Sequence, residues 1–516
     1  MWSLDNHFGM STLCLYLPLV FVFYIFSNHF FNKLRNLPPS PILNLPFLGH
    51  LYLLKKPIHR SLAKISDSYG PILLLQFGSR RVLVVSSPSA AEECLSKNDI
   101  VFANRPRLIA GKHIGNNYTT MGWAPYGDHW RNLRRVSSIE LLSTHRLQML
   151  QHIRTDEVNA MMKRLYRASK AHQMVDMKTA FFELTMNVMM RMIAGKRYYG
   201  ENVEEIEAAN RFREIVIETF RTGGASNMAD FLPVLRWLGE LGGVEKRLMA
   251  LQQKRDIFMQ DLVEEWKTRM GSIAAGCGGG GEEKTMIEVL LTLQEKEPEY
   301  YTDRIIRNLM LVLLVAGTDT SSGTMEWALS LLLNNPEILK KAQNEIDNHV
   351  GHQRLMNEAD MVDLPYLRCI INETMRMYPA APLLVPHESS EESIIGGYHI
   401  PRGTMLLVNS WSIQNDPKLW EDPREFKPER FEGLEGTTDG FKLLPFGSGR
   451  RRCPGEGLAL RIVELGLGSL IQCFDWETVG KEMVDMTEGF GLTTPKAQPL
   501  MAKCHPRPFT AKLLFH

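Results

Sequence analysis

The 516-residue chain has no marked excess of charge of either sign. Lys and Arg number 59 and Asp and Glu number 58, which gives a net charge of +1. Nucleic-acid-binding proteins carry an excess or a surface patch of basic residues, so this balance of charge argues against a nucleic-acid partner. Apolar residues make up 44% and charged residues 23%, which are ordinary values for a globular protein and exclude a mostly disordered chain.

Cysteine is scarce and scattered. There are seven, an odd number, and no two form a C-x-x-C pair. A disulfide framework or a zinc ribbon is therefore excluded, and the pattern favours a reducing compartment.

Several catalytic signatures are also missing. The chain contains no G-x-x-x-x-G-K-[ST], no H-E-x-x-H and no G-x-S-x-G. Residues 276–281, GCGGGG, formally match G-x-G-x-x-G, but they follow a polar helical stretch and are low in complexity, which predicts a surface linker. The methionine-rich residues 186–193 predict an apolar core helix rather than a copper site.

One long run lacks charge altogether. Residues 13–31 are almost entirely apolar, and the next charge is Lys33. At 1.5 Å per residue, such a run is about long enough to cross a bilayer core of ~30 Å. Lys33 and Arg35 follow it and Asp5 precedes it, so the positive-inside rule places the body in the cytosol. A cleaved signal peptide is the alternative, but the basic start and the A-x-A site are missing.

The prolines after this run predict a stiff hinge. Four of them lie in residues 37–51, where each fixes φ and removes an N–H donor. We therefore expect three parts, which are an N-terminal segment with a membrane anchor (1–32), a hinge (33–50) and a cytosolic body (51–516).

The residue patterns of the body predict a mainly helical structure. Residues 72–77 and 82–85 predict a β-hairpin, whereas helical patterns dominate from about residue 125 to about residue 380. Residues 303–333 predict a helix roughly 45 Å long that is apolar on nearly all sides and therefore buried. The expected fold class is mainly α with small β-sheets, plus one N-terminal transmembrane helix.

Within that long helix lies an unusual polar patch, residues 316–321, AGTDTS. Ala316 leaves space beside the backbone, while Asp319 and Thr320 place an acid and a hydroxyl where apolar residues are expected. A buried acid without a partner costs several kcal/mol, which indicates a function or a partner. Proton delivery to a ligand is one interpretation, and a helix contact through small residues is the other.

A second patch surrounds a single cysteine. Residues 446–455, FGSGRRRCPG, place glycines and arginines next to Cys453. A thiolate is stabilised by positive potential and backbone N–H groups, and glycine lets the backbone approach the sulfur closely. A basic surface turn with a buried cysteine is the alternative.

This pattern resembles the cysteine loop of the cytochrome P-450 haem-thiolate monooxygenases, F-x-x-G-x-R-x-C-x-G. Every fixed position matches, through Phe446, Gly449, Arg451, Cys453 and Gly455. Four further motifs of the family are present in order, and they are Trp130 with Arg134, residues 316–320, Glu373 with Arg376, and residues 428–431 containing Arg430.

The resemblance implies haem b as cofactor, with Cys453 as the axial iron ligand and Phe446, Arg451 and Gly455 in its loop. It implies that Trp130 and Arg134 hold a haem propionate. His387 is either a further propionate contact or a satisfied core histidine.

The resemblance also implies roles away from the haem. Asp319 and Thr320 would be the catalytic proton-delivering residues. Glu373, Arg376 and Arg430 would form a structural ion triad.

The resemblance implies partners as well. NADPH would act indirectly, through an NADPH-cytochrome reductase that docks on the basic cysteine side, at Arg131, Arg135 and residues 450–452. Dioxygen and a small aromatic substrate complete the reaction. The anchor and hinge are similar to those of microsomal members, which implies the endoplasmic reticulum membrane.

Three stretches resemble plant microsomal enzymes of the isoflavone-hydroxylase group, which act on phenolics; they are residues 102–107, 126–135 and 381–392. By analogy, the substrate pocket includes Leu313, Ala316, Leu383, Leu384 and Phe490. Hydroxylation of an aromatic metabolite is the leading hypothesis, and ring closure by phenol coupling or a methylenedioxy bridge is its alternative. A reductase-independent isomerase or dehydratase and a non-catalytic haem-binding scaffold are the others. The sequence does not specify the substrate or the position attacked.

Overall fold

A computed structural model describes residues 16, 19–20, 22–27, 29–200, 206–222, 227–236, 242–274, 284–433, 440–480 and 482–515. The chain divides into two units. The first comprises residues 1–106, 227–241 and 383–412, and the second comprises residues 107–226, 242–382 and 413–516.

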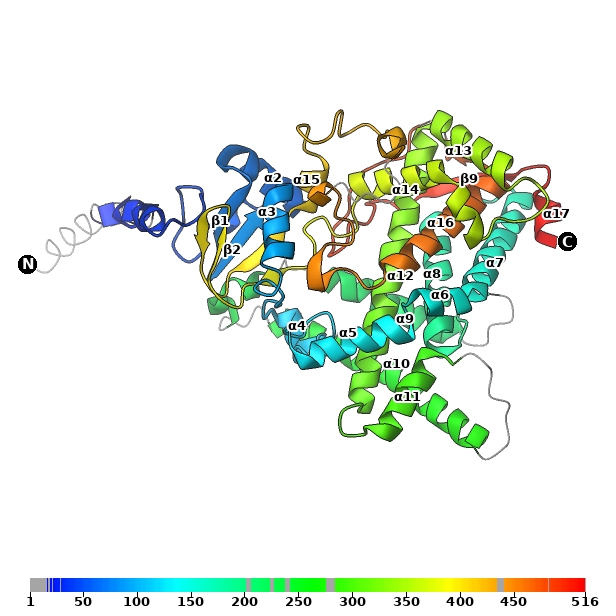
Figure 1. The fold of residues 1–516 in the computed structure, drawn as a ribbon, viewed down its shortest axis with the longest axis horizontal. Coiled ribbons are helices and arrows are strands. Elements are labelled where there is room, and N and C mark those ends of the chain that lie inside the picture. The colour runs from blue at the N-terminus through cyan, green and yellow to red at the C-terminus, as the bar shows by residue number, and fades with distance from the viewer. Residues whose placement is uncertain are drawn as a thin grey trace, which may run out of the picture. The chain divides into compact units, whose positions relative to one another are not determined.

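The first unit is built on a four-stranded sheet with the order β1-β2-β7-β4 (Figure 1). Strand β1 pairs with β2 and β7 with β4 in antiparallel fashion, whereas β2 and β7 are parallel. A separate hairpin joins β5 and β6. The regular elements of this unit are α2 (Ile58–Tyr69), β1 (Ile72–Phe77), β2 (Arg80–Val85), α3 (Pro88–Glu92), β4 (His387–Glu388), β5 (Ser393–Ile395), β6 (Tyr398–Ile400) and β7 (Met405–Val408).

The first hairpin is tighter than the sequence predicts. Phe77 pairs with Arg80, so the turn consists of Gly78 and Ser79 alone, and β2 begins two residues before the predicted strand. Gly78 has φ +55°, and a Cβ there would lie 2.0 Å from the carbonyl oxygen of Phe231. Only glycine fits both the backbone angle and this contact, which lets the chain around Phe231 pack against the turn.

The second unit is mainly helical. Its helices are α4 (Ile109–His113), α5 (Asp128–Glu140), α6 (Thr144–Met149), α7 (Gln151–Lys170), α8 (Met177–Ala194), α9 (Ile206–Thr222), α10 (Gly242–Ala274), α11 (Met286–Lys296), α12 (Asp303–Asn334), α13 (Pro336–His349), α14 (Pro365–Met377), α16 (Glu456–Cys473) and α17 (Thr510–Phe515). Helix α15 (Ser410–Gln414) contains the last of the points at which the chain passes from one unit to the other. A small sheet joins β3 (Val175–Asp176), β9 (Met501–Pro506) and β8 (Phe474–Thr478) in that order.

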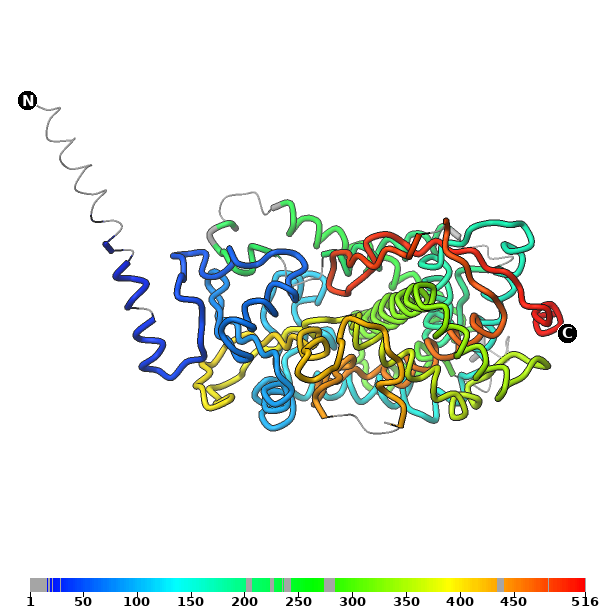
Figure 2. Tube along the Cα trace, turned by 90° about the horizontal axis from the view of Figure 1, so that it is seen from above, coloured from blue at the N-terminus to red at the C-terminus, as the bar shows by residue number. Residues whose placement is uncertain are grey.

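The long helix α12 runs through the middle of this unit, as Figure 2 shows in a view nearly along its axis. Its apolar side chains are buried over most of its length, as the sequence predicts. Helix α8 packs against it so closely that a Cβ on Gly317 would lie 2.6 Å from the Met189 sulfur. The Thr185 hydroxyl also donates a hydrogen bond to the Thr318 carbonyl, at 3.0 Å. Gly317 therefore makes room for α8.

The prediction of a mainly helical fold with small sheets is confirmed. The methionine-rich residues 186–193 lie in α8, where their methionines are buried. The predicted linker at 276–281 lies outside the described residues.

The predicted membrane anchor is described only in part. Residues 13–15, 17–18, 21 and 28 lie outside the described part of the chain. The described residues from 16 to 34 are helical, and large apolar side chains such as Phe23 and Phe26 are exposed. Over the described residues, no helix combines the length and apolarity that crossing a bilayer requires.

Candidate functional site

The cysteine loop wraps around the Cys453 sulfur. The Cys453 amide donates to the carbonyl of Phe446 at 2.9 Å, and the Gly455 amide donates to the Cys453 sulfur. Among the described cysteines, Cys453 is exposed, whereas Cys94, Cys369, Cys473 and Cys504 are buried. Desolvation nevertheless raises the pKa of the Cys453 thiol, although the Gly455 N–H and Arg134 act against it. Both observations fit a sulfur that is accessible to solvent but has protein groups close around it.

Two arginines and a tryptophan lie around this loop. The Arg451 guanidinium lies 4.4 Å from the centre of the Trp130 ring. Burial and the nearby positive charge of Arg134 lower the pKa of Arg451 to about 10. Arg134 donates to the carbonyl of Arg452 at 2.7 Å, and among the described residues it has no ion pair. Two neighbouring cations, one of them without a carboxylate partner, form a site that suits an anionic group.

Trp130 is oriented by its own hydrogen bond. Its ring N–H donates to the carbonyl of Met121 at 3.1 Å, and the side chain is buried. Arg451 donates to the same carbonyl at 3.3 Å and also to that of Ala124. Trp130 and Arg451 are thus held in a fixed arrangement with residues 121–124.

His387 belongs to the first unit and starts strand β4. Its ring is buried, and Nδ1 lies 2.7 Å from the carbonyl oxygen of Phe102. This contact requires Nδ1 to carry the proton, because a carbonyl oxygen only accepts.

The polar patch of α12 opens to solvent at one residue. Ala316 is exposed, although Leu313, Leu314 and Val315 before it are at most 7% exposed. The Thr320 hydroxyl donates to the Ala316 carbonyl at 2.8 Å. An exposed alanine in the middle of a buried helix indicates open space beside this turn.

The Asp319 side chain contacts Thr493, whereas the Thr320 hydroxyl turns back to its own helix. Its Oδ2 accepts a hydrogen bond of 2.9 Å from the Thr493 hydroxyl. Burial raises the pKa of Asp319, while this hydrogen bond and the more distant Lys178 lower it. A carboxyl with a raised pKa can hold and release a proton nearer to neutral pH.

The second unit thus has the features that a haem requires, which are a solvent-accessible thiol, two adjacent guanidiniums and an open turn of a buried helix. The raised pKa of the free thiol does not conflict with thiolate ligation, because a bound metal ion deprotonates a coordinating thiol.

Glu373, Arg376 and Arg430 contact one another. Arg376 forms two hydrogen bonds to the Glu373 carboxylate, of 2.6 and 2.9 Å, and Arg430 adds one of 3.1 Å. Glu373 and Arg376 are completely buried. Arg376 also donates to the carbonyls of Gln414, at 2.7 Å, and Pro423, at 2.9 Å. The cluster therefore joins α14 to the chain between residues 414 and 430.

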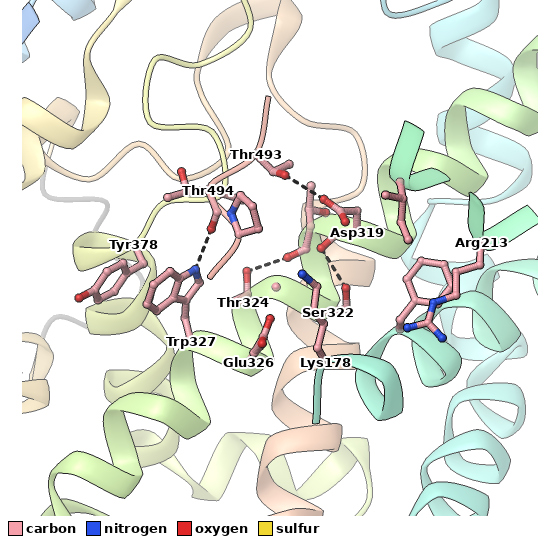
Figure 3. Close-up of a pocket in the computed structure, with 16 residues that line it drawn as sticks. Lys178, Arg213, Asp319, Ser322, Thr324, Glu326, Trp327, Tyr378, Thr493 and Thr494 are labelled. Carbon is pink, nitrogen blue, oxygen red and sulfur yellow. Dashed lines mark hydrogen bonds between the residues drawn. The ribbon is translucent and has the colours of Figure 1, made fainter. Parts of the chain in front are cut away.

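A small pocket of about 60 Å³ lies on the Asp319 side of α12 (Figure 3). Asp319, Thr320, Glu326 and Trp327 line it from α12, and Lys178 from α8. The Trp327 ring stacks on Tyr378 at 3.9 Å, and its N–H donates to the carbonyl of Thr494 at 2.8 Å.

The residues predicted to line a substrate pocket have different surroundings. Leu313 is buried in α12, and Phe490 is 66% exposed. Leu383 packs against the apolar core of the first unit's sheet, and Leu384 is buried with a φ of +51°.

Glu326 and Lys178, to which the sequence pattern assigns no role in catalysis, line the same pocket as Asp319, and Thr493 binds Asp319 directly. The spacing of Glu326, seven residues after Asp319 in an apolar helix, is a signal that was available. Nothing in the sequence indicates that Thr493 meets Asp319, because 174 residues separate them.

Known proteins resemble this chain over most of its length. The family profile described as Cytochrome P450 matches residues 38–501. Cytochrome P450 81Q32 of Catharanthus roseus is 52% identical over 484 residues, which cover 94% of each chain. The (+)-piperitol/(+)-sesamin synthase CYP81Q2 of Sesamum radiatum is 48% identical, covering 98% of this chain and 97% of that one. An isoflavone 2'-hydroxylase of Glycyrrhiza echinata is 45% identical, covering 98% of both.

Among solved structures, a zebra fish cytochrome P450 described with progesterone superposes with a TM-score of 0.75. It is 25% identical, and the match covers 88% of this chain and 100% of that one. Members of this family are monooxygenases that carry a haem with a cysteine thiolate ligand and receive electrons from NADPH through a reductase. Profile, relatives and fold agree over most of the sequence, and the chain therefore belongs to the cytochrome P450 family and is a haem-thiolate monooxygenase of the plant 81 type.

Proposed function

We propose that this monooxygenase hydroxylates an aromatic or phenolic plant metabolite, such as an isoflavonoid. The open turn of α12 carries the proposal, because Ala316 exposes a small apolar surface one turn before the Asp319–Thr320 pair. A flat ring can approach such a surface closely. The likeness to an isoflavone 2'-hydroxylase over 98% of the chain supports this substrate class.

Cys453 is the proposed axial ligand, and the Gly455 amide that donates to its sulfur moderates the charge on it. Arg134, Arg451 and Trp130 would hold the anionic edge of the haem, through the guanidinium pair described above. His387 is a further candidate for that edge. When bound, the haem supplies the oxygen activation, and these residues orient it and neutralise its acidic groups.

Asp319 and Thr320 are the proposed proton-delivering residues. Burial raises the pKa of Asp319, so this carboxyl binds a proton more readily than a free carboxyl does. The Thr320 hydroxyl, one residue further along α12, can accept a proton and pass on its own. Its present bond to the Ala316 carbonyl keeps the hydroxyl on the open side of the helix.

We also propose a single N-terminal anchor (1–32) in the endoplasmic reticulum membrane, a hinge (33–50) and a cytosolic catalytic body (51–516). The uncharged run at 13–31, its basic flank and the exposed phenylalanines in its described part support this arrangement. The exposed Arg450 and Arg452 of the cysteine loop, together with the exposed Arg131 and Arg135 of α5, are candidates for the reductase-docking face.

The test of the catalytic pair is Thr320→Ala, with Thr318→Ala as the matched control. Both threonines lie on α12 and donate to the carbonyl four residues earlier, but Thr318 faces α8. We expect Thr320→Ala to bind haem and substrate normally. Its oxidation of NADPH should produce hydrogen peroxide in place of hydroxylated product. The control should remain as coupled as the wild type. Unchanged coupling in Thr320→Ala would contradict the assignment.

Ring closure is the second candidate outcome, because one relative is named as a synthase of piperitol and sesamin. The two outcomes are distinguished by supplying isotopically labelled dioxygen. A hydroxylase incorporates one labelled oxygen into the product, whereas closure of a methylenedioxy bridge releases both as water.

A further inference from the structure

We propose that Glu326 is a second proton-carrying carboxyl of this enzyme, which passes protons through the pocket of Figure 3 to Asp319. The inference rests on the proposed role of Asp319 and Thr320 and extends it by one residue and one pocket.

The geometry of α12 places both carboxyls at the same pocket. Glu326 follows Asp319 by seven residues, which is two helical turns or about 10 Å along the axis. Both residues line the pocket, with Ser322 and Gly323 between them. Glu326 is only 2% exposed, so the pocket is the polar space that its carboxyl can reach.

Only one oxygen of the Glu326 carboxyl accepts a hydrogen bond from the described residues. Its Oε1 accepts the Leu500 amide at 2.9 Å. Over the described residues it makes no other hydrogen bond and no ion pair, so Oε2 has no protein partner there. A buried carboxyl with an unpartnered oxygen beside a pocket suits a group that binds water and exchanges a proton.

Lys178 acts on both carboxyls at once. It reaches into the pocket from α8, and its positive charge lowers the pKa of both Asp319 and Glu326. It forms no direct ion pair with either among the described residues. A cation near two buried acids that pairs directly with neither reduces the cost of ionising each of them without fixing the charge on one.

The remaining charges near Glu326 come from β3, from α9 and from the segment that precedes β9. Lys496 lowers the pKa of Glu326 and Asp176 raises it, while burial is the largest influence and raises it. Arg213 lines the same pocket from α9, but its guanidinium donates to the Thr179 hydroxyl and lies over the Phe182 ring. None of these groups compensates fully for the burial of Glu326.

Hydroxyl groups line the space between the two acids. The Thr494 hydroxyl is buried at the pocket and makes no hydrogen bond among the described residues, and the Thr493 hydroxyl binds Asp319 Oδ2. Pocket water can therefore bridge Glu326 Oε2 and Asp319 Oδ1. Each proton that Asp319 releases towards Thr320 is replaced through this water by the Glu326 proton. Glu326 is then protonated again from solvent, so the charge of the pair is restored.

The alternative is that Glu326 only anchors the Leu500 amide. Glu326→Gln separates the two roles, because its amide oxygen still accepts that N–H but carries no exchangeable acid proton. If Glu326 relays protons, we expect unchanged folding, haem content and substrate-induced spin shift. Coupling of NADPH oxidation to product should fall roughly tenfold, with a larger solvent isotope effect.

Two further readouts test the Glu326 proton itself, and the first of them does not depend on turnover. Infrared difference spectra across a pH titration should show a protonated buried carboxyl that Glu326→Gln removes. In the wild type, coupling should decline as pH rises and Glu326 loses its proton, and this decline should be absent in the variant. Glu464→Gln is the matched control, since Glu464 is also buried with a raised pKa but lies on α16 and does not line this pocket.

The comparison with Asp319→Asn distinguishes the possible failures. We expect Asp319→Asn to uncouple the enzyme, and the double variant to be no worse, because both acids act in one path. If Asp319→Asn is uncoupled but Glu326→Gln equals Glu464→Gln in every readout, the inference is wrong and the proposed function stands. If Asp319→Asn is fully coupled, the proposed role of Asp319 in proton delivery is wrong, and the inference about Glu326 that rests on it is wrong as well.

Discussion

Replacement of Arg376 by alanine is the most stringent test of what holds the helical unit together. Arg376 is completely buried and makes four hydrogen bonds, two to the Glu373 carboxylate and one each to the carbonyls of Gln414 and Pro423. The variant would leave Glu373 as a buried charge that has lost its principal partner. It would also leave two carbonyls without their donor.

Breaking a buried ion pair from one side typically costs about 3–5 kcal/mol. Glu373 would keep the Arg430 contact at 3.1 Å and the Lys427 amide at 3.0 Å, so we expect a loss near the lower end of that range. The free energy of unfolding should be measured by urea titration of the full chain, followed by circular dichroism. Haem content after purification is the second readout.

The matched control is Arg354→Ala. Arg354 also forms a two-bond pair, with Asp360 at 2.6 and 2.7 Å, but its side chain is half exposed. An exposed pair contributes about 0–1 kcal/mol, so this variant should be nearly as stable as the wild type. If Arg376→Ala fails to fold, Arg376→Lys replaces it, because lysine keeps the charge but cannot form both hydrogen bonds to Glu373. Its free energy of unfolding should lie between that of the wild type and the value expected for Arg376→Ala. A loss below about 1 kcal/mol in Arg376→Ala would refute the reasoning.

Two further predictions concern α12 and the cysteine loop. Gly317→Ala places a methyl group 2.6 Å from the Met189 sulfur. We therefore expect the free energy of unfolding to fall by about 1–3 kcal/mol. Adding Met189→Ala in a double variant should recover part of that loss, because it removes the side chain that the methyl group meets. A loss in Gly317→Ala that Met189→Ala leaves unchanged would contradict this contact. Arg134→Ala removes one of two adjacent guanidiniums, so haem should transfer to apomyoglobin several times faster than from the wild type. Equal transfer rates would exclude Arg134 as a haem contact.

Much of the architecture was accessible from sequence because it depends on local patterns. The apolar residues of 303–333 repeat on all sides of a helix, and α12 occupies Asp303–Asn334. The spacing of Glu373 and Arg376 places them on one face of α14, where they pair. The patterns that succeeded concern residues within a few turns of each other.

Features that depend on distant segments could not be predicted. The sequence leaves open whether the small residues of 316–321 make room for a ligand or for another helix, and in the structure Gly317 makes room for Met189 of α8. The Thr493–Asp319 bond joins residues that are 174 positions apart in the sequence. The predicted effect of the arginines on Cys453 is present, since Arg134 lowers the thiol pKa, but burial outweighs it. Such balances depend on packing, which a single sequence does not specify.

The central claim is that Cys453 ligates a haem in this chain, and the carbon monoxide difference spectrum of the reduced protein tests it most directly. We expect the full chain, expressed in microsomes, to give the long-wavelength band of a thiolate-ligated haem, and Cys453→Ser to lose it. Cys369→Ser, which alters a buried cysteine elsewhere in the same unit, should keep the band. A thiolate band that survives in Cys453→Ser, or its absence from well-folded wild-type protein, would contradict the account.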